Sequence, residues 1–532
     1  MFQETVVARV TDLKDGEMKE VEVDGAKVLL VRLKGRFFAI GGECSHYGGP
    51  LAEGALSGSR VVCPWHQATF NVQTGEVLEP PALDDLARFE VRVEGDQVIV
   101  RTPDTGAGPH PPQMCRCDSR ADGRTLVILG AGAAGNVAAQ TLRQDDFKGK
   151  VVMITQEMRL PYDRPNLSKG YLAGLAPPDS LPLRSEDFFR QIEVEVLLGR
   201  RVVQVNHGSR EIIFHDGARL NYDGLLLATG SIPRRLAAPG ADLENVFTLR
   251  SADDADAIMA AAPAGAQAVV VGGSFIGMEV AASLTKRGLQ VAVTAPGATP
   301  FARTLGPEIG GVFQKLHEEN GVAFHLGARV DKLEGRGRVE QVHLSTGVTL
   351  PADLVVVGIE VRPATDFLKG VDVNADGSVS VDECLKVAEG LYAAGDIARF
   401  PDWRTGEAMR IEHWRLAQQH GRVAAHNMAG KPVAFRGVPF FWTEHFDLNL
   451  QYVGFAAAWD DLIIHGDLAA RNFLAFYVRE GRVLAAAGIN QDRKLAAIAE
   501  LMRQEALPRL EELAAGPLDF SELLGRLPQL EA

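Results

Sequence analysis

The chain contains little cysteine, with 5 such residues among 532. So few thiols exclude a small secreted domain held together by disulfides and favour a reducing cytoplasm. The first residues, Met1-Phe2-Gln3-Glu4-Thr5, form neither a basic segment nor an apolar one, so no secretory signal is expected. A cytoplasmic enzyme or binding protein is the class that these absences leave.

The chain also lacks an excess of positive charge. Its 55 Lys and Arg residues face 69 Asp and Glu residues, for a net charge of −14. This balance argues against nucleic acid or an anionic membrane as partner. No apolar run is long enough to span a bilayer, so no membrane span is expected. At this length one hydrophobic core is excluded, and three or four domains are expected.

Two of the five cysteines stand in short Cys–His pairs, Cys44-Ser45-His46 and Cys63-Pro64-Trp65-His66. Thiolates hold iron and sulfide, and neutral imidazoles can replace thiolates on one iron of a [2Fe–2S] cluster. Residue types and spacing together resemble the Rieske cluster motif, with Cys44, His46, Cys63 and His66 as metal ligands. A single zinc ion with the same ligands is the alternative.

Short β-forming segments separated by Gly or Asp turns fill residues 1–103, which predicts a small all-β domain carrying both ligand loops. Gly49 and Trp65 stand where respiratory members of the Rieske family have an extra disulfide, so this domain resembles the ferredoxin-like members. In that family the histidine-bound iron lies nearer the surface, which implies that the histidines form the electron exit. Residues 104–124 read as a Pro/Gly-rich linker; for Cys115 and Cys117 within it no role is assigned.

An α/β pattern begins at the apolar strand 125–129. Gly130, Gly132 and Gly135 follow it at once, then a helical run, a second strand and Glu157. This is the complete dinucleotide fingerprint: glycines for the tight turn and the close approach of phosphate, and an acid for the ribose hydroxyls. Strand, helix and acid together predict a doubly wound nucleotide-binding domain.

A second fingerprint carries Gly272, Gly273 and Gly277, with Ser274 in the place of the middle glycine. Its second strand ends at Ala295, where an acid would hold the ribose of NADH. Neither an acid nor an arginine pair is there, so the choice between NADH and NADPH stays open. Two fingerprints predict two Rossmann-like domains, one nested within the sequence of the other.

Further motifs complete a family resemblance. The segments concerned are 160–169 (LPYDRPNLSK), 228–230 (ATG), 391–398 (LYAAGDIA), 412–414 (EHW) and 438–443 (VPFFWT). They resemble the FAD-dependent ferredoxin reductases. With the Rieske motif in front, nearly the whole chain is similar to the apoptosis-inducing-factor-3-like flavoproteins.

The resemblance implies roles for particular residues. Asp396 would bind the ribityl chain of FAD, and Arg164 its phosphate or ribose. Lys169 would lie at the reactive edge of the flavin, paired with Glu279, and Trp442 would pack nearby. The pair also makes physical sense, because a flavin that accepts hydride gains negative charge that an ammonium stabilises.

The resemblance and the motifs predict five parts: 1–103 Rieske domain, 104–124 linker, 125–245 with 363–435 FAD domain, 246–362 NAD(P)H domain, and 436–532 an α+β C-terminal domain. A dimer through the last part is possible. Disulfide reductases of this fold carry a Cys-x4-Cys beside the flavin, but segment 163–168 has no cysteine. We assign no role to the scattered histidines at positions 413, 420, 445 and 465.

The function expected is an NAD(P)H oxidoreductase. Hydride passes to FAD, and single electrons pass to the cluster and on to an external acceptor such as a ferredoxin, a cytochrome or an oxygenase component. The alternative is a slowly turning NADH sensor of the apoptosis-inducing-factor type. An oxygenase would need a mononuclear iron site, for which no His-His-carboxylate cluster stands out.

Overall fold

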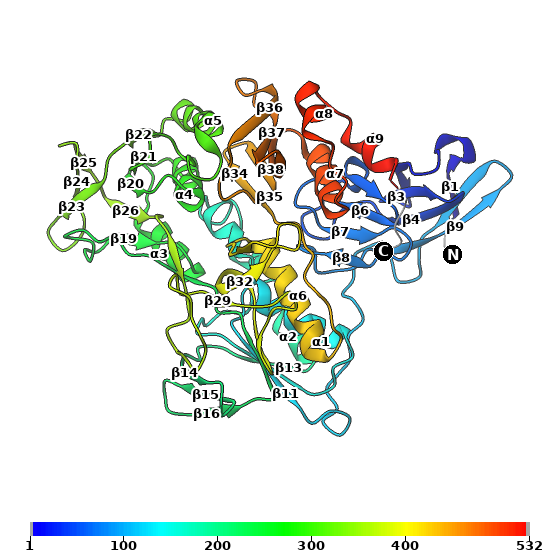
Figure 1. Cartoon of the computed structure of the whole chain (residues 1–532), viewed down its shortest axis with the longest axis horizontal. Helices are drawn as coiled ribbons and strands as arrows, with labels where there is room; N and C mark the ends of the chain where they lie inside the picture. The colour runs from blue at the N-terminus through cyan, green and yellow to red at the C-terminus, as the bar shows by residue number, and fades with distance from the viewer. Residues whose placement is uncertain (1–3, 528–532) are drawn as a thin grey trace.

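The computed structural model describes residues 4–527. Its N-terminal part is all β, as predicted (Figure 1). One sheet has the order β1-β10-β9-β4-β3-β2, with strands Glu4–Arg9, Gln97–Arg101, Arg88–Glu94, Arg36–Gly41, Ala26–Leu33 and Met18–Val23. A smaller sheet has the order β5-β6-β7-β8, with strands Ala55–Ser57, Arg60–Val62, Thr69–Asn71 and Val77–Glu79. The two Cys–His loops come directly after β4 and β6, so strand ends position both.

Two sheets with parallel cores form the middle of the chain. The first has the order β13-β12-β11-β17-β31-β30, with strands Val194–Leu197, Lys150–Ile154, Thr125–Leu129, Gly224–Leu227, Leu391–Ala393 and Lys386–Ala388. The second has the order β19-β26-β20-β21-β22, with strands Val246–Thr248, Leu354–Val357, Gln267–Val271, Gln290–Ala295 and Ala323–Leu326. Helices α1 (Ala133–Gln144) and α4 (Phe275–Lys286) follow β11 and β20 directly, which confirms the two Rossmann-like folds.

The C-terminal part is α+β, as expected. Its antiparallel sheet has the order β34-β35-β38-β37-β36, with strands Phe440–His445, Leu448–Gly454, Arg482–Ile489, Asn472–Arg479 and Asp461–Asp467. Helices α7, α8 and α9 follow, at Asp492–Arg503, Leu510–Ala515 and Phe520–Gly525. Figure 1 shows this sheet between the N-terminal domain on one side and α4 with α5 (Gly306–Glu319) on the other. We propose the domain boundaries given above as the division of the chain.

The N-terminal domain shares a hydrophobic core with the C-terminal sheet. Ala55 and Val62 pack in one buried cluster with Val438, Phe440 and Leu495. Burying apolar side chains from both sides of a domain boundary stabilises one fixed arrangement, whereas loosely tethered domains leave such surfaces polar. The N-terminal domain is therefore docked onto the rest of the chain.

Helix α6 (Trp414–Ala429) fastens the same domain by hydrogen bonds. The buried Arg415 donates from Nε to the carbonyl of Pro80 over 2.8 Å and from Nη2 to that of Gln67 over 3.1 Å. Arg422 donates to the carbonyl of Leu78 over 2.6 Å. The linker is anchored too, because the amide of Cys115 donates to Arg143 O over 2.9 Å and its thiol to Phe147 O over 3.3 Å.

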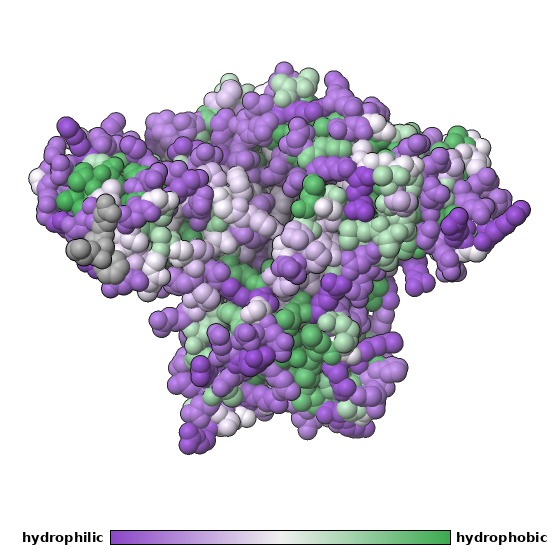
Figure 2. Space-filling model, turned by 180° about the vertical axis from the view of Figure 1, so that it is seen from behind, coloured by the Kyte–Doolittle hydropathy of each residue, from purple (hydrophilic) through white to green (hydrophobic). Residues whose placement is uncertain are grey.

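Hydrophilic residues cover most of the face seen in Figure 2, and the green areas on it are limited in size. Within residues 4–527, no helix combines the length and the apolar character needed to cross a membrane.

Candidate functional site

A cavity of about 1010 Å³ lies where the two parallel-sheet domains meet the C-terminal sheet. The turn after β11 forms one wall. Gly130 has φ +115°, and a Cβ there would lie 2.1 Å from Ala228 O; a Cβ on Gly135 would lie 1.8 Å from Gly130 O. By contrast, nothing lies within 4 Å of a Cβ built on Gly132, so this backbone is open to the cavity. Such a turn fits the close approach of a pyrophosphate to a helix N-terminus.

The turn after β20 repeats this geometry. Gly272 has φ +127°, and a Cβ on Gly277 would lie 2.2 Å from Gly272 O. Ser274 replaces the middle glycine without strain, since its φ is −99° and its hydroxyl donates to Gly358 O over 3.0 Å. Gly273 faces Ala295 at the end of β21, where a Cβ on the glycine would lie 3.2 Å from that of the alanine. The second turn is therefore also shaped for a dinucleotide.

Glu157 lies at the cavity wall beyond β12, held by two donors. Its carboxylate accepts from Arg164 Nη2 over 2.9 Å and from the hydroxyl of Tyr162 over 2.6 Å. Burial opposes the charged form of Glu157, but the guanidinium and the hydroxyl outweigh it and lower the pKa of the carboxyl. An ionised acceptor at this place suits ribose hydroxyls, and the role stays a prediction.

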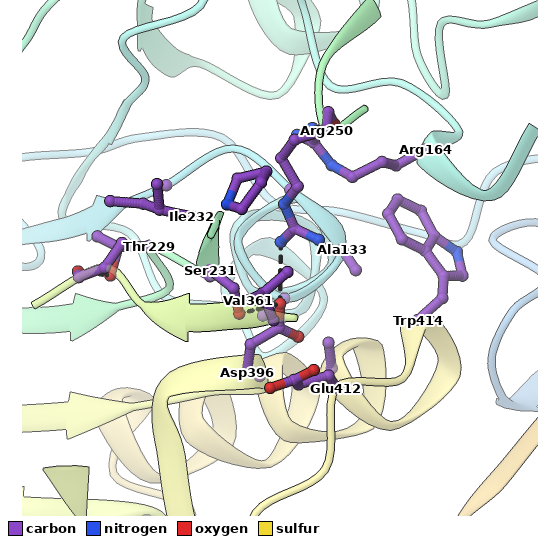
Figure 3. A pocket seen from close by; sticks show the side chains of 18 of the residues that line it. Ala133, Arg164, Thr229, Ser231, Ile232, Arg250, Val361, Asp396, Glu412 and Trp414 are labelled. Carbon is purple, nitrogen blue, oxygen red and sulfur yellow. Dashed lines mark hydrogen bonds and ion pairs between the residues drawn. The ribbon is translucent and has the colours of Figure 1, made fainter. Parts of the chain in front are cut away.

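Figure 3 shows Asp396 and Arg250 pointing toward each other inside the cavity. Oδ2 of Asp396 accepts from Arg250 Nη2 over 2.9 Å and from Ser231 Oγ over 2.8 Å. Glu412 and Trp414 face the same space. Sequence reasoning missed Arg250 and Ser231, because neither lies in a recognisable motif.

Lys169 and Glu279 meet at the cavity, as expected from the motifs. Nζ of the lysine lies 2.8 Å from Oε2 of the glutamate, with side-chain exposures of 12% and 4%. Ser168 Oγ donates to the same oxygen over 2.5 Å, and Thr443 Oγ1 donates to Oε1 over 2.6 Å. Three donors thus surround a buried carboxylate, which holds the ammonium in a fixed place at the cavity.

The four expected metal ligands lie as two pairs. Cys44 and Cys63 lie close enough for each thiol to shift the pKa of the other, and Nδ1 of His46 lies 3.2 Å from Nδ1 of His66. Among the described residues, no three His, Cys, Asp or Glu side chains gather as a site for one metal ion. Burial lowers the pKa of His46 to about 3 and the pKa of His66 well below its usual value, so both imidazoles are neutral, the form that binds metal. Two thiols and two imidazoles, paired by type, fit a two-iron cluster.

The histidine pair is half-buried and lies beside Trp442 of the C-terminal sheet. The His66 ring lies 4.3 Å from that of Trp442, and the His46 ring 6.4 Å from it, by centroid distances. Trp442 in turn lines the cavity. This position argues against the histidines as the exit surface, because the docked domain places them beside the C-terminal sheet; where electrons leave stays a prediction.

A second link between the cluster loop and the cavity was not anticipated. The hydroxyl of Tyr47, next to His46, donates to the buried Asp163 of the segment that ends at Lys169. No local signal marks this contact, because the two residues lie 116 positions apart in the chain.

Comparison with known proteins settles the family. The model for pyridine nucleotide-disulphide oxidoreductases matches residues 124–421, that for the Rieske [2Fe-2S] domain residues 3–90, and that for the reductase C-terminal domain residues 440–524. Apoptosis-inducing factor 3 of Mus musculus and that of Homo sapiens are each 40% identical to the chain over 521 residues, covering 96% of it and 86% of the relative.

The chain belongs to the apoptosis-inducing-factor-3 family. Putidaredoxin reductase of Pseudomonas putida is 32% identical over 414 residues, covering 74% of this chain and 98% of that protein. The solved complex of putidaredoxin reductase with putidaredoxin matches with a TM-score of 0.72 at 30% identity, covering 75% of this chain and 98% of that one. The chain is therefore an NAD(P)H-dependent flavoprotein oxidoreductase whose cofactors are FAD and a Rieske [2Fe–2S] cluster.

The chain has no pair of cysteines beside the cavity that could accept electrons as a dithiol. None of the five cysteines forms a disulfide, and segment 163–168, part of which lines the cavity, contains no cysteine. Cys117 donates its amide to Glu193 Oε2 over 2.8 Å, and neither linker cysteine faces the cavity. The assignments of Gly130, Gly132, Gly135, Gly272, Gly273 and Gly277 to dinucleotide contacts remain predictions that this geometry supports.

Proposed function

We propose that the chain passes electrons from NAD(P)H through its FAD to its own Rieske cluster, and from there to an external one-electron acceptor. The observation that supports this route is the position of Trp442. Its ring lines the cavity and lies 4.3 Å from the ring of His66, so the two expected cofactor sites share one aromatic side chain.

The residues of the cavity have defined parts in this proposal. FAD supplies the conversion of a two-electron donor into single electrons. Gly132 and Glu157 bind its pyrophosphate and ribose, and Asp396 its ribityl chain. Lys169, kept charged by Glu279, stabilises the negative charge that hydride brings. Trp442 packs between the flavin and the cluster and excludes water from the gap.

For the exit we propose the thiolate side of the cluster instead of the histidine side. Trp65 follows Cys63 closely in the chain and is 37% exposed, and a Cβ on Gly49 would lie 2.8 Å from the sulfur of Cys63 and 3.2 Å from the Trp65 ring. The acceptor would approach there. One similar solved structure is titled as a complex of putidaredoxin reductase with putidaredoxin, and a relative is named as a ferredoxin--NAD(+) reductase component, so the acceptor that we propose is a small redox protein. The cytoplasmic location and the dimer through 436–532 belong to the proposal.

Trp442→Leu tests the route, with Trp459→Leu as matched control, because Trp459 packs on Tyr477 in the same sheet domain. Loaded protein is mixed with NADH without oxygen and frozen at intervals for EPR, while flavin absorbance is followed. We expect cluster reduction, measured relative to flavin bleaching in the same protein, to be slowed about tenfold or more in Trp442→Leu and not in Trp459→Leu; tenfold is a barrier increase of about 1.4 kcal/mol.

Three outcomes would count against the proposal or against the part of Trp442 in it. A cluster signal that never appears in the wild type, despite a bleached flavin, would refute internal transfer. A long-lived reduced flavin with poor turnover toward ferricyanide or a cytochrome would favour the NADH-sensing alternative. Equal rates in all three proteins would remove Trp442 from the route.

A further inference from the structure

A chain of buried hydrogen bonds leads away from the cavity, starting at Glu279. Oε1 of Glu279 is bonded to Thr443 Oγ1 over 2.6 Å. The same hydroxyl lies 2.8 Å from Nε2 of His445, and Nδ1 of His445 lies 3.2 Å from Nε2 of His317. Thr443, His445 and His317 are each 0% exposed. Side chains of three elements, α4, β34 and α5, thus form one polar thread through an apolar core.

The donors of this thread all point toward Glu279. A carboxylate only accepts, so the hydroxyl of Thr443 donates to it and its oxygen accepts from Nε2–H of His445. Nδ1 of His445 then accepts from Nε2–H of His317. Burial lowers the pKa of His445 to about 3, although the backbone of Met278 opposes the shift, and it lowers the pKa of His317 to about 2, so each ring carries one proton. The tautomers assigned here are those that give every hydrogen bond of the thread a donor.

The far end of the thread is a free lone pair. Nδ1 of His317 is buried and has no hydrogen-bond partner among residues 4–527. His317 lies in the last turn of α5, next to the exposed Glu318 and Glu319. The cations Lys169, which directly follows η3 (Arg164–Ser168), and Lys286, at the end of α4, favour the neutral form of His445.

We propose that Thr443, His445 and His317 form a proton relay, which protonates the carboxylate of Glu279 when negative charge arrives in the cavity beside Lys169. A proton from the medium reaches Nδ1 of the buried His317 when the end of α5 opens locally, and the proton on Nε2 of His317 then passes to Nδ1 of His445. Nε2–H of His445 then passes to Thr443 Oγ1, and the hydroxyl proton of Thr443 passes to Oε1 of Glu279. One proton enters, one carboxylate becomes a carboxylic acid, and nothing is oxidised.

The negative charge that hydride brings into the cavity is what would drive a proton along the relay. Hydride from NAD(P)H adds one negative charge next to Glu279, which favours the protonated acid and frees Lys169 to compensate the new charge. After the hops every hydrogen bond of the thread is reversed but still made, so the path is set to return the proton when the electrons leave. The inference rests on the proposed flavin position at Lys169 and not on transfer to the cluster.

The test separates proton transfer from mere hydrogen bonding. His445→Gln can still donate an amide N–H to Thr443, but an amide does not pass a proton on; His445→Phe removes both properties. The flavin-loaded chain is mixed with NADH in weak buffer, and a pH indicator and flavin absorbance are followed together. Infrared difference spectra of reduced minus oxidised protein monitor the carboxylic-acid band, and Glu279→Gln identifies the part that this residue causes.

In the wild type we expect Glu279-dependent proton uptake to keep pace with flavin reduction, and an acid band that Glu279→Gln removes. His445→Gln should slow this uptake about tenfold or more with the same end point. His317→Gln should do the same, and His465→Gln, in β36 at the opposite edge of the same sheet, should not.

Proton uptake in His445→Gln as fast as in the wild type would overturn the relay. Proton uptake that is slowed only in His445→Phe would also overturn it, because His445 would then only order its neighbours by hydrogen bonding. The absence of a Glu279-dependent acid band would also overturn it. A cluster that stays oxidised while these signals persist would refute the internal electron route and leave the relay intact.

Discussion

Arg415 should hold the N-terminal domain against the reductase, and Arg415→Met tests this. The guanidinium is buried and makes two hydrogen bonds to carbonyls of that domain, at Pro80 and Gln67. Hydrogen bonds from a charged donor contribute about 1.5–3 kcal/mol each, so their loss weakens docking by about 3 kcal/mol or more. At about 1.4 kcal/mol per factor of ten, the undocked population should rise roughly a hundredfold. Met keeps much of the apolar stem, so the effect isolates the polar contacts.

Hydrogen exchange followed by mass spectrometry measures that population, because exchange at residues 67–80 reports local opening of this contact. Arg235→Met is the control, since its side chain is 89% exposed and its ion pair with Asp242 spans 3.8 Å. We expect faster exchange in Arg415→Met alone, with slower cluster reduction and unchanged flavin bleaching. Unchanged exchange, or an equal change in both variants, would refute the reasoning.

Two further changes have expected outcomes. Ala295→Glu places a carboxylate at the end of β21 for the ribose of NADH. The ratio of kcat/KM for NADH to that for NADPH should rise about tenfold or more, given about 1.5–3 kcal/mol for a charge-assisted hydrogen bond; an unchanged ratio would contradict this. Burial lowers the pKa of His420 to about 3, so below about pH 6.5 the unfolded chain binds a proton that the folded chain does not. The free energy of unfolding should therefore decrease as the pH falls below about 6.5. His420→Gln, whose amide oxygen can still accept from the Gly395 amide, should reduce that slope by up to about 1.4 kcal/mol per pH unit, as measured by urea titrations. Parallel slopes in both proteins would contradict this assignment.

The parts of the site that the sequence predicts are those built from neighbours in the chain. Cys44 and His46, or Gly130 and Gly132, lie within one loop, so their spacing alone records the geometry that a cluster or a phosphate needs. The strand at 125–129 was likewise found at its observed bounds, since it is an apolar run next to a fingerprint.

The parts that the sequence does not predict join distant segments. Arg250 meets Asp396 across 146 positions, and Thr443 meets Glu279 across 164. Neither contact follows from a local pattern, because each depends on how whole domains are placed. The position of His66 beside Trp442 has the same cause: its loop was recognisable, but its surroundings depend on the docking of the domain.

The core that Ala55 and Val62 share with Phe440 and Leu495 has a consequence for how this chain can be divided. Cutting it in the linker would expose that apolar face on both fragments, which favours their association or aggregation in water. Relatives that match three quarters of the chain consist of the reductase part alone. Here the cluster domain is a structural component of the reductase, and synthesis of the chain fixes their ratio at one to one.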